Sequence, residues 1–259
     1  MKINETYSVS IILPILNEIN SLKKTLKILN KINVKKEFLI IYSNKLTDNN
    51  VKDEILKLKK KYKNIRSKPQ QRPFVGGAID LGIKLSIKNY IVIMASDLET
   101  DPNELNNMIN VSKKNPKYIV SADRWIGQKS FSNYGIIKFL ANFFFQKLIK
   151  LFFRYDILDF TFAYRLYPKK ALKGYKIKEL RHGFALEILL YPIKKGFEVI
   201  TLPAKWKKRV EGSSSITIKG YISYLRGENP INFPQKLYPI DCYNGKYLYA
   251  ANCLLHHNV

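Results

Sequence analysis

The strongest constraint on the fold is the regular alternation of strand-like and helix-like segments in the first half of the chain. Four short apolar runs have the length and composition of buried strands: Ser8–Leu13, Phe38–Tyr42, Tyr90–Ala95 and Tyr118–Ala122. Segments with helical periodicity lie between them. This alternation predicts an α/β fold of right-handed βαβ units, with a mostly parallel central sheet flanked by helices. In such sheets ligands bind beyond the carboxyl ends of the strands.

The chain is strongly basic, with 45 Lys and Arg residues against 20 Asp and Glu residues and a formal net charge of +25. This excess indicates an anionic partner: nucleic acid, an anionic membrane surface or a phosphate-bearing substrate. Lysine runs such as 57–63 are also typical of solvated helix faces. Because the lysines are scattered and no nucleic-acid-binding motif occurs, we expect no nucleic-acid partner. A basic nucleic-acid-binding module remains the rival hypothesis from another class.

Three acidic residues follow the third strand-like run, in the segment YIVIMASDLETDP. Asp97 and Glu99 point to the same side if the chain stays extended, so both are candidates to face one ion. Magnesium prefers one or two carboxylates together with phosphate oxygens of a substrate. Asp101, just before Pro102, is instead a candidate to cap the next helix. Acids at strand ends are also common as solvated turn residues, so this motif alone is weak.

Other strand ends carry polar or glycine-rich segments as well. PILNE follows the first strand, Thr47 and Asp48 follow the second, and glycines open the third helix in VGGAIDLG. Backbone N–H groups at such a helix start are suited to phosphate. The glycine pattern is not the dinucleotide-binding fingerprint, which requires G-x-G-x-x-G directly after a strand.

The segment 135–154 is far more apolar than an ordinary surface helix. Its polar stripe consists of Lys138, Asn142, Gln146, Lys150 and Arg154 at i,i+4 spacing, with a wide apolar side opposite. An apolar face rimmed by Lys and Arg suits a helix that lies in a membrane interface. The alternative is a core helix of a large domain. No uninterrupted apolar run is long enough to span a membrane, and no signal peptide is evident, so we expect a cytoplasmic, peripheral protein.

Six segments resemble, in order, the motifs of family-2 glycosyltransferases of GT-A fold. They are SVSIILPILNE, RPFVGGAIDLGIK, YIVIMASDLETDP, SADRW, LDFTFAYRLYPKKAL and GFALEILLYPIKKGFEVITLPAKWKKRVEGSSS. Within this family the resemblance is greatest to the dolichol-phosphate mannosyltransferase-like enzymes, which make polyprenyl-phosphate sugars. Each motif alone is weak, but the ordered set covers the chain from Ser8 to Ser215.

The resemblance implies a role for individual residues. It implies nucleotide-sugar binding by Pro14, Leu16, Asn17, Glu18, Ser43, Asn44, Gly77, Ala95, Ser96 and Asp97. The implied ligands of a divalent cation, Mg²⁺ or Mn²⁺, are Asp97 and Glu99. The implied catalytic residues are Asp97, Asp159, Arg124 and Arg209. Contacts to an acceptor phosphate are implied for Arg124, Lys138, Thr161, Arg209 and Ser214.

The implied reaction is an inverting transfer of a sugar from a GDP- or UDP-linked donor to a polyprenyl or dolichyl phosphate at the membrane surface. An anionic acceptor needs no strong general base, which agrees with histidines (His182, His256 and His257) that lie outside the matched site motifs. The catalytic domain is expected to span residues 1–226, with a tail of unknown role at 227–259. A saccharide acceptor in cell-surface polysaccharide synthesis is the alternative within the transferase interpretation.

The sequence departs from the family pattern at several positions. Ala95 replaces the first acid of D-x-D, Leu16 replaces a tyrosine, Ser43 and Asn44 replace paired acids, and Ser215 replaces a basic residue. A catalytically degenerate GT-A protein that serves as a partner of another transferase is therefore a further alternative. The sequence does not indicate the oligomeric state.

Overall fold

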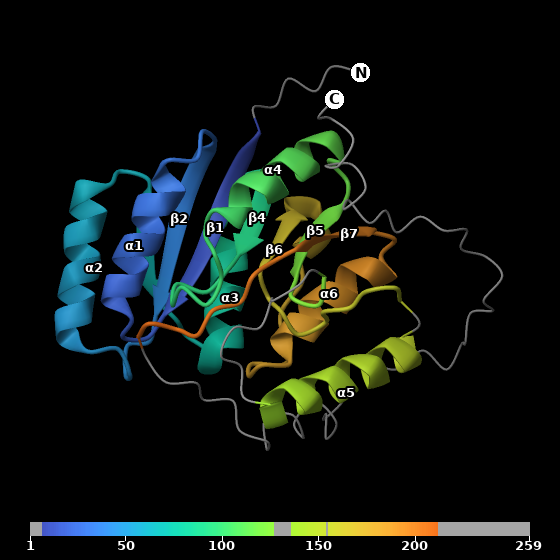
Figure 1. Cartoon of the computed structure of the whole chain (residues 1–259). Coiled ribbons are helices and arrows are strands. Elements are labelled where there is room, and N and C mark those ends of the chain that lie inside the picture. Colours follow the sequence, from blue (N-terminus) through green and yellow to red (C-terminus); the bar gives the residue numbers. More distant parts are fainter. Residues whose placement is uncertain (1–6, 127–135, 154, 212–259) are drawn as a thin grey trace, which may run out of the picture.

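Seven strands form one sheet in the order β3-β2-β1-β4-β6-β5-β7 (Figure 1). This computed structural model describes residues 7–126, 136–153 and 155–211. The strands are β1 (Ser8–Ile15), β2 (Lys35–Tyr42), β3 (Ile65–Pro69), β4 (Tyr90–Ile93), β5 (Ile119–Asp123), β6 (Arg165–Pro168) and β7 (Val199–Pro203). The helices are α1 (Ile19–Asn30), α2 (Asn49–Lys61), α3 (Phe74–Leu85), α4 (Glu104–Lys114), α5 (Ile136–Phe153), the short 3₁₀ helix η1 (Lys169–Leu172) and α6 (Phe184–Lys194).

The predicted α/β class with a mostly parallel sheet is confirmed. Strand β1 pairs in parallel with β2 and β4, β2 with β3, and β5 with β7. The short strand β6 runs antiparallel to both of its neighbours, β4 and β5. Strand β3 is not among the four strand-like runs that the sequence indicates, and β4 ends at Ile93 instead of Ala95. The early end of β4 frees the acidic segment to turn.

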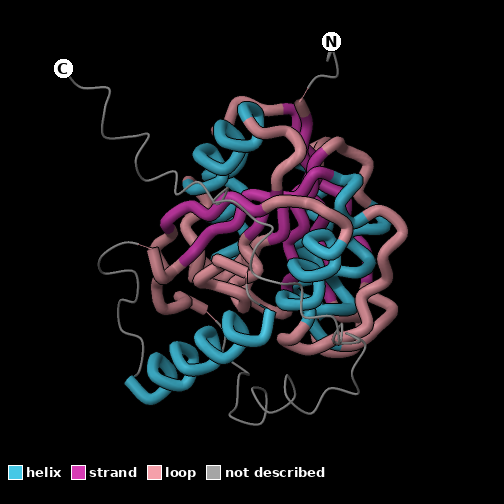
Figure 2. Tube along the Cα trace, turned by 90° about the vertical axis from the view of Figure 1, so that its right-hand side faces the viewer, coloured by secondary structure: helices cyan, strands magenta, loops and turns pink. Residues whose placement is uncertain are grey.

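Two apolar cores fill the space on either side of the sheet. Helices α1, α2 and α4 cover one face of the sheet, and α3 and α6 cover the other (Figures 1 and 2). Along β4, Val92 faces the first core while Ile91 and Ile93 face the second. A central strand that is apolar on both sides is expected where helices cover both faces of a sheet. The cores thus fix which strand ends lie together.

Helix α5 lies apart from the helices that flank the sheet, along one end of the molecule (Figures 1 and 2). Its polar residues Asn142 and Gln146 are buried, with 2% and 5% exposure, beside Phe145 and Ile149. Large apolar side chains point outward, with exposed fractions of 47% for Leu140, 67% for Phe144 and 72% for Leu151. One side of the helix thus joins the second core through Phe145 and Ile149, together with the middle of its polar stripe, while the opposite side is exposed. Among the described residues, no helix is long and apolar enough to span a membrane.

Candidate functional site

The carboxyl ends of β1 and β4 meet in a network of short hydrogen bonds. The hydroxyl of Ser96 donates to the carbonyl of Pro14 at 3.0 Å, which joins the two strand ends. The side-chain oxygen of Asn17 accepts from the backbone N–H of Asp48 at 2.9 Å, which adds the start of α2. Glu18 lies directly before α1, and its carboxylate accepts from the N–H of Asn17 at 3.1 Å. Residues predicted for the nucleotide-sugar site thus come together as strand order requires.

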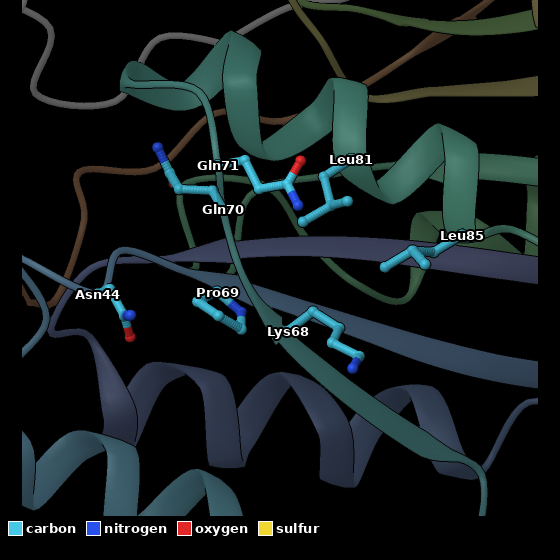
Figure 3. A pocket seen from close by; sticks show the side chains of 7 residues that line it. All are labelled: Asn44, Lys68, Pro69, Gln70, Gln71, Leu81 and Leu85. Atoms are coloured by element: carbon cyan, nitrogen blue, oxygen red, sulfur yellow. The ribbon is translucent and has the colours of Figure 1, made fainter.

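The loop after β2 is held largely by its own groups. The hydroxyl of Ser43 accepts from the N–H of Leu46 at 3.2 Å, and the N–H of Ser43 donates to the hydroxyl of Thr47 at 3.1 Å. Asn44 lines a surface pocket of about 440 Å³ between this loop, β3 and α3 (Figure 3). The other residues that line the pocket are Lys68, Pro69, Gln70, Gln71, Leu81 and Leu85. The pocket therefore adjoins the predicted nucleotide residues and does not include the acidic segment.

The acidic segment after β4 folds into a turn. The expectation that Asp97 and Glu99 share a side of an extended chain is wrong, because Leu98 has a positive φ of 63°. The N–H of Glu99 donates to the Asp97 carboxylate at 3.0 Å, which stabilises the turn. The carboxylate of Asp101 accepts a hydrogen bond from the N–H of Asn103 at 3.0 Å, immediately before α4. Asp101 therefore stabilises the turn that leads into that helix.

Arg209 joins the two carboxylates of this turn. Its Nε lies 2.8 Å from Oε1 of Glu99, and its Nη2 lies 3.3 Å from Oδ2 of Asp97. Asp97 is buried, and burial together with the nearby charge of Glu99 raises the pKa of its carboxyl to about 6. The carboxylates of Asp97 and Glu99 thus lie close enough together to contact one guanidinium group. Two carboxylates at this separation also fit a divalent cation. Among the described residues, no group of three or more His, Cys, Asp or Glu residues surrounds a point, so such a cation would need phosphate oxygens or water as further ligands.

Arg209 belongs to a segment that crosses the strand ends, residues 204–211, which we call the crossing segment. It begins with a bond from the N–H of Ala204 to the carbonyl of Asp123, at 2.9 Å. Trp206 then forms an antiparallel bridge with Thr100. At its far end the Glu211 carboxylate accepts from the N–H of Ser21 in α1 at 2.6 Å. The segment is therefore fixed both before and after Arg209.

A buried ion pair organises the other half of the site. Nε and Nη2 of Arg124 lie 2.6 and 2.9 Å from the two carboxylate oxygens of Asp159, and Nη2 also donates to the Thr161 hydroxyl at 3.0 Å. Burial alone would raise the pKa of the Asp159 carboxyl, but the Arg124 and Arg165 guanidinium groups hold it below its usual range. In this conformation Arg124 shapes the loop that carries Asp159 and Thr161.

Helix α5 contributes to the same loop through its buried polar side. The amide nitrogen of Gln146 donates to the Thr161 hydroxyl at 2.8 Å and to the Asp159 carboxylate at 3.2 Å, and its oxygen accepts from the N–H of Phe160 at 2.9 Å. Trp125, next to Arg124, packs on Phe143 of α5. The side chain of Lys138 and the whole of Ser214 lie outside the described residues.

The glycines of α3 serve close packing. A Cβ on Gly77 would lie 2.2 Å from the carbonyl oxygen of Arg72, and one on Gly76 would lie 2.7 Å from the carbonyl oxygen of Glu179. The N–H of Gly76 donates to the carbonyl of Leu180 at 2.8 Å. That N–H group is therefore used within the protein and is not offered to a phosphate.

The comparison with known sequences decides the family. The sequence pattern described as "Glycosyl transferase family 2" matches residues 10–176, which contain the acidic turn, Arg124 and Asp159. The chain belongs to glycosyl transferase family 2. It is accordingly an enzyme of the class that transfers a sugar from a nucleotide-sugar donor.

Solved structures agree on the fold of this family 2 glycosyltransferase. Glucosyl-3-phosphoglycerate synthase from Mycobacterium tuberculosis, in complex with uridine diphosphate, is similar with a TM-score of 0.61 and 11% identity, over 85% of this chain and 78% of that one. The same synthase in complex with Mn²⁺, UDP-glucose and phosphoglyceric acid has a TM-score of 0.59 and 12% identity, over 79% and 73% of the two chains. A further mycobacterial protein matches with a TM-score of 0.60 and 13% identity, over 79% and 68%. At these identities the likeness establishes a GT-A-like fold.

Sequence reasoning assigned no site role to four further residues around the candidate site, and it placed one of them, His182, outside the site motifs. Glu211 anchors the crossing segment, and Arg165, fully buried, donates to the carbonyl groups of Asp159 and Phe160. Asp123, at the end of β5, is buried with one carboxylate oxygen that has no partner among the described residues. His182 lies at the start of α6, and its pKa is lowered by burial and by the charges of Arg181 and Arg209. Each is an ordinary residue type in sequence, and tertiary placement gives it a role.

Proposed function

We propose that this protein is an inverting glycosyltransferase that moves a sugar from a nucleotide-sugar donor to a polyprenyl phosphate at a membrane surface. The observation that carries the proposal is the orientation of α5. Its buried side, through Gln146, holds the loop of Asp159 and Thr161, while its exposed side presents Leu140, Phe144 and Leu151. The same helix thus presents an exposed apolar surface, suited to lipid, and holds the loop that we expect to contact the acceptor.

The donor half of the proposal rests on the acidic turn. Asp97 and Glu99 would hold a divalent cation, which supplies charge neutralisation of the departing diphosphate. The adjoining pocket in Figure 3 offers the amides of Asn44 and Gln71, which can both donate and accept hydrogen bonds at the edge of a base. Pro14, Asn17 and Ser96 lie at the strand ends near the acidic turn and the loop after β2, which their hydrogen bonds connect. We assign the diphosphate to the acidic turn and the base to the pocket.

The acceptor half rests on the basic groups around the Asp159 loop. A phosphate acceptor is already anionic, so it attacks the sugar without losing a proton to a general base. Arg209 reaches the acidic turn from the crossing segment, and it is suited to hold phosphate oxygens of donor and acceptor together, because a guanidinium donates two parallel hydrogen bonds. In-line attack from the face opposite the leaving diphosphate inverts the anomeric configuration. Arg124 would shape this half of the site through Asp159.

The exposed side of α5 is sufficient for reversible membrane association. Full burial of a Leu or Phe side chain contributes about 1.5–3 kcal/mol, and each Lys near an anionic surface adds about 1 kcal/mol. Phe144, Leu148 and Leu151 are exposed, and Lys147 lies between them on the same helix. Partial burial of these three apolar side chains with one or two lysines gives a few kcal/mol. Such a peripheral enzyme binds vesicles weakly and is released by salt.

The test combines vesicle flotation with product analysis. The full chain is floated with anionic vesicles and compared with Phe144→Glu/Leu151→Glu, and Leu56→Glu on α2 is the control, because Leu56 is also exposed (51%). A screen of GDP- and UDP-sugars with Mn²⁺ and a short polyprenyl phosphate, followed by mass spectrometry, identifies the product. We expect flotation of the wild type and the control, loss of flotation in the double variant, and a glycosyl polyprenyl phosphate.

Two results would count against the lipid acceptor. If the α5 variant floats as well as the wild type, the exposed side of α5 does not bind the membrane, and the proposal loses its main support. Donor binding without any product on polyprenyl phosphate would favour a saccharide acceptor or a degenerate partner protein.

A hydroxyl acceptor is the second candidate, and His182 is the observation that favours it. Burial, together with the charges of Arg181 and Arg209, lowers its pKa, so the imidazole is neutral near pH 7. A neutral imidazole can accept the proton of an attacking hydroxyl. Under this candidate His182→Asn abolishes transfer to a saccharide, whereas under the lipid-phosphate proposal it leaves transfer largely intact. The same variant assayed with both acceptors separates the two.

A further inference from the structure

The guanidinium of Arg209 occupies the space between the two carboxylates that the proposed cation would share. Its nitrogen atoms lie 2.8 Å from Glu99 and 3.3 Å from Asp97, in the manner of a counter-ion. Mg²⁺ binds carboxylate oxygens at about 2.0–2.1 Å. The guanidinium holds one oxygen of each carboxylate, Oε1 of Glu99 and Oδ2 of Asp97, so it competes with a cation for these two oxygens.

The charge of the site also disfavours a divalent cation while Arg209 remains in place. The two carboxylates and one guanidinium sum to −1, and a divalent cation added without displacement of Arg209 would leave a net charge of +1 in a largely buried site. A nucleoside diphosphate brings at least two negative charges, so it balances both cationic groups at once.

The crossing segment allows the side chain of Arg209 to move while the backbone stays in place. On one side the N–H of Lys207 donates to the carbonyl of Glu99 at 3.0 Å. On the other side Glu211 accepts from the N–H of Ser21 and from the side-chain amide of Asn20, at 2.6 and 2.7 Å. Rotation of one arginine side chain between these anchors is enough to transfer the guanidinium from the carboxylates to a phosphate.

We propose that Arg209 is the resident counter-ion of Asp97 and Glu99, and that it makes cation binding conditional on the donor's diphosphate. In the free protein the guanidinium blocks the cation. When a nucleoside diphosphate arrives, the guanidinium moves onto its phosphate oxygens and the cation takes the carboxylates. The inference rests on the proposed function in naming the diphosphate, but the blocking step concerns this chain and Mn²⁺ alone.

The test measures Mn²⁺ binding to the full chain without any sugar donor, by the electron paramagnetic resonance signal of free Mn²⁺ and by calorimetry. Removal of a unit charge close to a divalent ion is expected to raise the affinity on the order of tenfold. We therefore expect Arg209→Gln to bind Mn²⁺ alone about tenfold more tightly than the wild type. Arg209→Lys, which keeps the charge, should stay near the wild type, and UDP or GDP should raise the wild-type affinity.

Matched controls decide what a change means. Lys207→Gln removes a charge from an exposed side chain of the same segment. A gain of the same size there would show a general charge effect and overturn the inference. Asp97→Asn/Arg209→Gln should lose the gain, and its persistence would also overturn the inference. An Arg209→Gln variant with wild-type Mn²⁺ affinity overturns it as well, while nucleotide-dependent Mn²⁺ binding in the wild type would leave the proposed function standing.

Discussion

Replacement of Arg124 by methionine tests the buried ion pair that organises the acceptor half of the site. Methionine keeps much of the volume of the side chain and removes its charge and its donors. Asp159 is 1% exposed, so its carboxylate cannot turn to water. Oδ1 of Asp159 keeps donors from Gln146 and Phe162 and loses the 2.9 Å bond to Nη2, whereas Oδ2 loses the 2.6 Å bond to Nε and keeps only the backbone N–H of residue 124, at 3.3 Å. The variant thus removes the positive charge and both side-chain donors of Arg124 from a buried carboxylate.

The expected cost follows from that geometry. Removal of one partner of a buried ion pair costs about 3–5 kcal/mol, because the remaining charge stays uncompensated. The donors that remain on Oδ1 place Arg124→Met near the lower end, at about 3 kcal/mol of unfolding free energy. The neutral pair Arg124→Met/Asp159→Asn should cost less than the sum of its two single variants, since no charge is left buried.

The cost should also depend on pH, with a definite sign. In the wild type the pKa of Asp159 is lowered, so its stabilising contribution is present above the unfolded pKa and is lost as the pH falls through the folded value. Without Arg124, burial is no longer outweighed and raises that pKa above the unfolded value. The ionised carboxyl then opposes folding, and the destabilisation of Arg124→Met is larger at pH 8 than at pH 5.

Urea denaturation followed by circular dichroism, at both pH values and for all four proteins of the cycle, measures these differences. A cost below about 1 kcal/mol, within the range of an exposed ion pair, would refute the reasoning. So would a cost that is equal at the two pH values, or a double variant whose cost equals the sum of the singles.

Three further predictions concern stability. Burial and the charge of Asp159 raise the pKa of Asp123 to about 7, above its unfolded value, so the wild type loses stability from pH 5 to pH 8 and Asp123→Asn should flatten that loss in urea titrations. Glu211→Ala removes a carboxylate from the start of α1 and should cost about 1 kcal/mol, whereas no change would show that the crossing segment is not anchored there. Gly77→Ala places a Cβ 2.2 Å from a backbone carbonyl oxygen and should cost about 3 kcal/mol, and a melting temperature equal to the wild type would contradict the close approach.

Local pattern was enough to predict which strand ends form the candidate site, because it specifies strands and where they end. The apolar run before Asp97 and the place of Pro14 to Glu18 after β1 follow from hydrophobic periodicity alone. Neighbouring parallel strands then bring those ends to one edge of the sheet. The same reasoning failed for Asp97 and Glu99 in detail, because the positive φ of Leu98 has no signal in an ordinary leucine.

The sequence by itself determined the α/β class, the acidic segment and the existence of a long apolar helix at α5. Only the tertiary structure decided that Arg209 meets Glu99 across 110 residues, and that Glu211 reaches α1 across 190. It also decided that the middle of the polar stripe of α5 faces inward, since the buried oxygens of Asp159 and Thr161 need donors that Gln146 supplies. Periodicity records which residues share a face. What that face meets depends on long-range pairing, and burial then requires every polar group there to find a partner.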